Sequence, residues 1–155
     1  IENQIINLLN FKSKQYCDMN FHMDFIKPPK KNKINHKLIN TILNNKNVGV
    51  ISCFNVSKFL KQYNTKIQKW IKLPIQKDNL FKKKIDKEFY KNVEKKIKNN
   101  SNVDFWIVAA GIHAKIFCNK IKCNGGVAID IGSSIDTWKN IYTSRSHLKK
   151  IALNN

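Results

Sequence analysis

Residues 103–134, VDFWIVAAGIHAKIFCNKIKCNGGVAIDIGSS, contain two short apolar runs separated by one helical pattern. The first run, 103–110, is almost continuously apolar, and the second, 126–131, also has the length of a strand. Between them, 112–123 has helical spacing and is followed by two glycines, which are common just beyond a helix C-terminus. A helix that joins two buried strands is typical of a parallel pair. We therefore expect the two strands to be adjacent.

The preceding chain shows the same alternation of elements. Apolar runs rich in β-branched residues predict strands at 47–53 and 66–74. Apolar spacing predicts helices at 35–45, 55–63 and 85–100. Strands that alternate with helices favour an α/β fold, and we predict a Rossmann-like parallel sheet flanked by helices.

The length of 155 residues suits a single α/β domain. We expect a helical and loop lead-in over 1–47 and a sheet core over 48–141, which closes with a short helix around 135–141. The sequence begins at Ile1 rather than Met, and we expect the domain to lack its N-terminal part here. No apolar run approaches the roughly 20 residues of a membrane-spanning helix. The expected location is the cytoplasm, with cysteines reduced.

The formal net charge of +19 raises the question of nucleic-acid binding. Arg145 is the only arginine among the 29 basic residues, whereas phosphate and base recognition favours the planar arginine fork. The lysines are also spread along the chain rather than clustered. We therefore do not expect nucleic acid to be a partner.

A first candidate binding element is the turn at Gly111, because ligands of open parallel sheets bind beyond the carboxyl ends of the strands. The backbone N–H groups of Ile112 and His113 are expected to point outward there as an anion cradle. His113 is a candidate phosphate contact. The alternatives are that Gly111 is small only for close packing, and that His113 lies in solvent.

A second candidate element is the turn at Gly132, where Ser133 and Ser134 supply possible donors. Asp130 stands inside an apolar strand, so its carboxylate is expected to bond backbone donors in a neighbouring loop or a ligand. Asp136 follows in the first turn of a helix. It either stabilises that helix or serves as a general base.

These two turns should form one wall of a pocket for a phosphorylated or sugar-bearing ligand. Arg145 follows in the hydroxyl-rich stretch YTSRS and is a natural partner for a diphosphate.

The stretch 103–138 also resembles the C-terminal half of the GT-D-type glycosyltransferase family. The resemblance is carried by the glycine turn after a strand, a K-I-F-C segment, the GG-x-A-I-D-I-GS motif, a D-x-W and a Ser-Arg pair. In this chain these are Gly111, Lys115–Cys118, Gly125–Ser133, Asp136–Trp138 and Ser144–Arg145. The stretch 48–53 looks like an earlier strand of the same domain.

The resemblance implies transfer of a hexosyl group from a nucleotide-sugar donor to a glycan or glycoprotein acceptor, as in polysaccharide biosynthesis. It also implies a divalent metal, Mn or Mg, held by an acidic D-x-E motif. Asp86-Lys87-Glu88 has that spacing, but it lies on an expected amphipathic helix, so the metal ligands are not identified in this stretch. His113 stands where relatives usually have a small residue. The candidate site therefore comprises catalytic Asp136 and substrate-binding Gly111, His113, Asp130, Gly132, Ser133, Ser134, Trp138 and Arg145.

Two other functions remain open from the sequence. The segment VAIDIGSS echoes the strand-D-x-G motif that binds S-adenosylmethionine in methyltransferases, although little chain follows it. A non-catalytic carbohydrate-assembly protein could keep the same fold without activity.

Overall fold

The computed structural model describes residues 34–75, 86–98 and 102–139. Residues 1–33 of the expected lead-in and the candidate diphosphate partner Arg145 lie outside these residues. The strands and helices expected within them are present, and the link into the helix after the third strand is a short 3-10 turn. In chain order, with η for a 3-10 helix, they are α3 (His36–Leu43), β1 (Asn47–Ser52), α4 (Ser57–Leu60), η1 (Lys61–Tyr63), β2 (Lys66–Lys72), α6 (Lys87–Lys98), β3 (Phe105–Ala109), η2 (Gly111–His113), α7 (Ala114–Cys123), β4 (Ala128–Asp130) and α8 (Ser134–Trp138).

The described strands form one parallel sheet of four strands in the order β2-β1-β3-β4. β3 and β4 are neighbours, with Ile107 opposite Ile129 and Val108 opposite Asp130. The predicted adjacency of these strands and the predicted α/β fold are therefore confirmed. β1 and β3 are buried along almost their whole length, as expected for inner strands covered on both faces.

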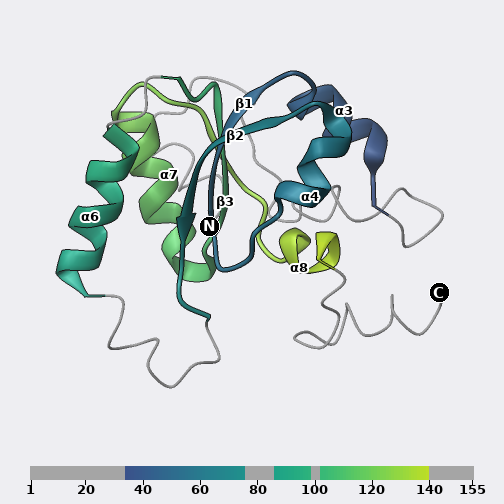
Figure 1. Ribbon diagram of the computed structural model, residues 1–155. Coiled ribbons are helices and arrows are strands. Elements are labelled where there is room, and N and C mark those ends of the chain that lie inside the picture. The colour runs from purple at the N-terminus through teal and green to yellow at the C-terminus, as the bar shows by residue number, and fades with distance from the viewer. Residues whose placement is uncertain (1–33, 76–85, 99–101, 140–155) are drawn as a thin grey trace, which may run out of the picture.

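Helices cover both faces of the sheet, which gives three layers (Figure 1). α6 and α7 pack on one face through Val93, Ile97, Phe117 and Ile121. α3, α4 and α8 pack on the other face, where the apolar core includes Ile39, Leu43, Leu60, Ile135 and Trp138. Since successive residues of a strand point to opposite faces, β1 and β3 supply side chains to both cores.

The strand β2 contains an irregularity that decides which side chains face which core. Val48 of β1 pairs with Ile67, but the next residue, Gly49, pairs with Lys69, so Gln68 is an extra residue in β2. A bulge of this kind reverses the facing of everything beyond it. Ile67 and Trp70 therefore contact one core, whereas Ile71 is buried in the other.

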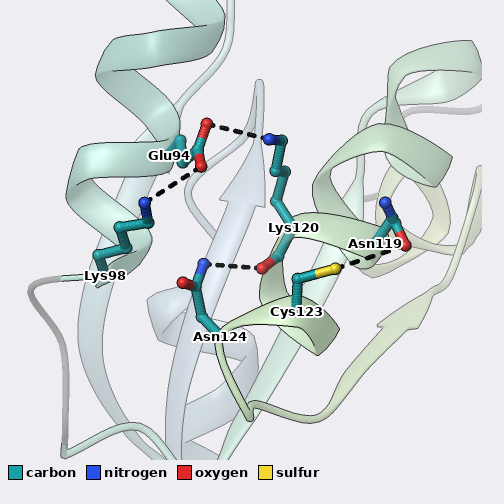
Figure 2. A network of polar contacts seen from close by, with 6 residues as sticks. All are labelled: Glu94, Lys98, Asn119, Lys120, Cys123 and Asn124. Carbon is teal, nitrogen blue, oxygen red and sulfur yellow. Dashed lines mark hydrogen bonds and ion pairs between the residues drawn. The ribbon is translucent and has the colours of Figure 1, made fainter.

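The helices α6 and α7 are joined on their outer side by one carboxylate (Figure 2). Glu94 accepts from Lys120 of α7 at 3.2 Å and from Lys98 of its own helix at 3.4 Å. The hydrogen bond from Lys120 is the main reason that the pKa of Glu94 lies below its ordinary value. Because these groups are solvated, we assign the contact a modest structural role.

Candidate functional site

The order of the strands identifies one place in the sheet as the expected ligand crevice. From β1 the chain passes to β2 on one side, and β3 then lies on the opposite side of β1. In doubly wound sheets, the loops that follow two such strands run in opposite directions and leave a crevice between them. Ligands bind in that crevice, at the carboxyl ends of the strands. The loops concerned follow Ser52 of β1 and Ala109 of β3. The predicted glycine turns lie at this edge, after β3 and after β4.

The Gly111 turn has a backbone that suits glycine, since its φ is +55°. The turn closes as the 3-10 helix η2, in which the N–H of His113 donates to the carbonyl of Ala110 at 3.2 Å. The expectation that this N–H points outward to a ligand is therefore wrong. A 3-10 turn satisfies at once a donor that an α-helix start would leave open.

The His113 side chain is half-buried and faces the helix layer beside the turn. Its Nδ1 is hydrogen-bonded to the Tyr90 hydroxyl of α6, and the two ring centroids are 5.8 Å apart. Tyr90 also contacts the ring of Phe117 on α7. The alternative of a His113 side chain standing in solvent is thus wrong. No local sequence pattern identifies Tyr90, because this contact needs α6 to pack beside the η2 turn and α7.

The Gly132 turn is held by the aspartate two residues before it. Oδ1 of Asp130 accepts the N–H of Gly132 at 2.9 Å, and Gly132 has a φ of +49°. The expected bond from Asp130 to a backbone donor is therefore present, but the expected position inside an apolar strand is wrong, because Asp130 is exposed. β4 has three residues and ends at Asp130, so this carboxylate lies in solvent and bonds within its own turn. Such a turn is common for aspartate.

The serines of this turn lie beneath the surface rather than on it. Ser133 is 3% exposed and Ser134 is fully buried, and the N–H of Ser134 donates to the carbonyl of Ile131 at 3.0 Å. The Ser133 hydroxyl and the hydroxyl of Thr137, one helical turn later, make no hydrogen bond with the described residues. Thr137 was not predicted from the sequence. A donor role for the serine hydroxyls stays a prediction.

Asp136 lies in the first turn of α8 and is half-buried. Burial raises the pKa of the Cys53 thiol, and the negative charge of Asp136 raises it further. The carboxylate is therefore near the carboxyl end of β1, which is one side of the expected crevice. Cys53 and Asp136 are far apart in the sequence, so only the fold reveals that they are neighbours.

Trp138 closes α8 and packs it against α4 within the same helix layer. Its ring stacks on Phe59 with centroids 4.6 Å apart and planes 17° apart, and it is 5% exposed. The ring is thus part of the apolar core. A contact between Trp138 and substrate stays a prediction.

The reactivity of the two α7 thiols, Cys118 and Cys123, tests the described packing of this helix against the sheet. Burial, with a smaller contribution from the charge of Asp130, raises the pKa of Cys118 to about 11, whereas Cys123 is exposed. A raised pKa keeps a thiol protonated and unreactive. We predict that iodoacetamide near pH 8 modifies Cys123 well before Cys118, measured by peptide mass spectrometry.

The charge of Asp130 contributes to the raised pKa of Cys118, so a change at Asp130 tests whether the two side chains are neighbours. Asp130→Asn should bring the pKa of Cys118 closer to its ordinary value and speed its alkylation. Equal labelling of Cys118 and Cys123 in the folded parent protein would contradict the described packing.

A divalent metal does not fit the described residues. Among them, no group of three or more His, Cys, Asp or Glu side chains could hold a metal ion. The D-x-E spacing at the start of α6 serves the helix instead, because Oδ1 of Asp86 accepts the N–H of Phe89 at 2.8 Å. Glu88 is exposed in that first turn.

Comparison with known proteins identifies a family for this chain. The family described as a GT-D fold-like domain matches residues 5–138, which is most of the chain and extends well beyond the C-terminal half that carried the resemblance. No curated protein and no solved structure matches the chain.

Proposed function

From the premise that this chain belongs to the GT-D-like family, we propose that it binds a nucleotide-sugar and transfers the sugar to a glycan acceptor. The observation that carries the proposal is the reversal of strand order between β1 and β3, with Asp136 near the end of β1 and a glycine turn at the end of β3. The family fold supports a glycosyltransferase-like domain, and the edge of the sheet supplies the place where the donor would bind.

The glycine turns would serve the phosphates and sugar of the donor. Gly111 and Gly132 both have positive φ and follow neighbouring strands. Without a Cβ, each lets a ligand approach the main chain closely, as in other phosphate-binding turns. His113, held by Tyr90 beside the first turn, would add a polar group next to the diphosphate.

Asp136 would act on the acceptor. In the proposed step its carboxylate takes the proton of an acceptor hydroxyl, whose oxygen bonds to the anomeric carbon of the donor sugar. The bond from that carbon to the diphosphate breaks, and the nucleoside diphosphate leaves with the bonding pair. A positioned general base contributes about 10² to 10⁴ in rate.

The methyltransferase alternative gains no support from the fold. The Asp130-Ile131-Gly132 segment follows β4, which is the edge strand of the described sheet and the last described strand. S-Adenosylmethionine is accordingly kept as a comparison ligand in the test.

Titration calorimetry with a panel of nucleotide-sugars tests the proposed function. We expect one nucleotide class to bind with a dissociation constant of about 1 μM to 1 mM, the usual range for enzyme substrates. The matching nucleoside diphosphate should compete. Gly132→Val should weaken binding, because a β-branched residue does not tolerate a positive φ and adds bulk at the turn.

Three outcomes decide the proposal. Binding of S-adenosylmethionine but of no nucleotide-sugar would overturn it. Binding of a nucleotide-sugar with product formation would support an enzyme, and binding with no product in any acceptor mixture would favour the non-catalytic carbohydrate-assembly protein.

A further inference from the structure

Two exposed isoleucines stand one helical turn apart where the η2 turn leads into α7, one in the turn and one on the helix. Ile112, in the η2 turn, is 80% exposed, and Ile116, one helical turn later, is 44% exposed. Ala114, Phe117 and Ile121 of the same helix are buried against the sheet. Ile112 and Ile116 thus form an apolar ridge that points away from the sheet.

Exposed lysines occur on α7 itself and on α6, whose Tyr90 contacts His113 beside this apolar ridge. Lys115 lies on α7 between the two isoleucines and is exposed. On the adjoining helix α6, Lys87, Lys91 and Lys95 recur every fourth residue and are also exposed, so they share one face. α6 and α7 both follow a strand of the parallel sheet and lie side by side in one layer (Figure 1).

These four lysines differ from Lys98 and Lys120 of the helix pair in having no carboxylate partner among the described residues. Glu94 is paired with Lys98 and Lys120, as Figure 2 shows, so those two lysines are already compensated within the helix pair. Lys87, Lys91, Lys95 and Lys115 make no ion pair with a described residue. The basic ridge, defined as these four lysines with Ile112 and Ile116, is therefore both cationic and apolar.

We propose that the basic ridge docks this protein on the surface of a lipid bilayer that carries anionic headgroups. A cationic helical surface with protruding aliphatic side chains is the combination that binds such an interface, because lysines remain among the headgroups while apolar side chains enter the acyl boundary. Lys side chains suit this diffuse attraction, since no planar fork is needed to meet a headgroup. No described helix has the length and apolar character to cross the bilayer itself.

Other occupants fit the ridge less well. A second copy of the chain, with its formal net charge of +19, would repel the first. A nucleic acid would satisfy the lysines through its phosphates but would offer nothing to Ile112 and Ile116. Docking through this helix face does not depend on the proposed sugar transfer.

Co-sedimentation of the full chain with vesicles tests the proposal. We expect binding to vesicles of phosphatidylcholine mixed with phosphatidylserine, little binding to pure phosphatidylcholine, and weakening by salt. Changing Lys87, Lys91 and Lys95 together to Gln should weaken binding at least tenfold, since each lysine near an anionic surface contributes severalfold. Ile112→Ser with Ile116→Ser should also weaken it at least tenfold.

Matched variants elsewhere on the chain serve as controls. Lys37, Lys46 and Lys58, exposed on or beside the opposite helix layer, changed together to Gln remove the same charge and should weaken binding much less. Val127→Ser removes a 57% exposed apolar side chain before β4 and should leave binding unchanged.

Two results would overturn the proposal. One is equal loss of binding with both sets of lysine changes, which would show that net charge alone matters. The other is a lysine-dependent interaction that ignores the isoleucine changes and is matched by a duplex DNA oligonucleotide, which would identify the face as a general polyanion surface. Circular dichroism of each variant confirms that the fold is intact.

Discussion

Asp136→Asn should lower the rate of sugar transfer about a hundredfold or more while the protein stays folded. The amide has nearly the shape of the carboxylate but cannot accept the acceptor's proton, and loss of a general base costs about 10² to 10⁴ in rate. The affinity for the donor should change little, because the proposed role concerns the acceptor. Steady-state kinetics and donor calorimetry on the same preparation measure both quantities.

The control for Asp136→Asn is Glu88→Gln, which removes an exposed carboxylate from the first turn of a different helix, α6. It should leave the rate unchanged. If Asp136 only stabilised α8, its loss would cost under about 1 kcal/mol and the rate would stay near that of the parent. That result would remove Asp136 from the mechanism.

A second readout shows whether Asp136 lies where the structure places it. Its charge helps to hold the pKa of the Cys53 thiol above the ordinary value. Asp136→Asn should therefore lower the pKa of Cys53 and speed its alkylation, whatever happens to catalysis. An unchanged Cys53 would contradict the described position of Asp136 and not merely its role.

Gly49→Ala should be among the most destabilising single substitutions in the sheet. Gly49 lies in the inner strand β1 and pairs with Trp106 of β3. A Cβ at this position would lie closer than 3.0 Å to the Trp106 indole ring, which is itself 2% exposed and cannot move outward freely. Overpacking of this kind costs about 3 kcal/mol. For a domain of this size that lowers the melting temperature by about 6–12 °C.

The matched control for Gly49→Ala is Gly125→Ala. Gly125 has open space around it but a φ of +77°, so its substitution introduces backbone strain without a clash. Its cost should be about 1–2 kcal/mol. A Gly49→Ala variant that melts no lower than Gly125→Ala would show that the indole ring does not rest on β1 as described.

The central strand–helix–strand unit could be predicted because its signals are local. The apolar residues of β3 are contiguous, the helix ends at two glycines, and a connection of that length leaves parallel neighbours as the simple solution. The facing of β2 could not be predicted in the same way. The extra residue at Gln68 reverses the alternation within the strand, and nothing in its local sequence distinguishes a bulge from a regular strand.

The candidate site was predictable as a location more than as a set of contacts. The turns at Gly111 and Gly132 were expected, and both have the positive φ that makes glycine useful there. The cradle of N–H groups was wrong at His113, because the choice between a 3-10 and an α-helical first turn depends on packing beyond the turn. The Tyr90–His113 hydrogen bond and the nearness of Asp136 to Cys53 join distant parts of the chain, so only the fold reveals them.

The most direct test of a donor site at the carboxyl edge is a nuclear magnetic resonance titration of protein labelled with ¹⁵N at glycine only. The chain has five glycines, so their amide signals report on few, well-separated places. Gly111 and Gly132 lie at the carboxyl edge, Gly49 lies inside the sheet, and Gly125 and Gly126 line a hollow of about 320 Å³ at the opposite edge. A nucleotide-sugar that binds as proposed should shift the Gly111 and Gly132 signals and leave Gly125 and Gly126 in place. Shifts confined to Gly125 and Gly126 would put the ligand in the opposite hollow and contradict the account.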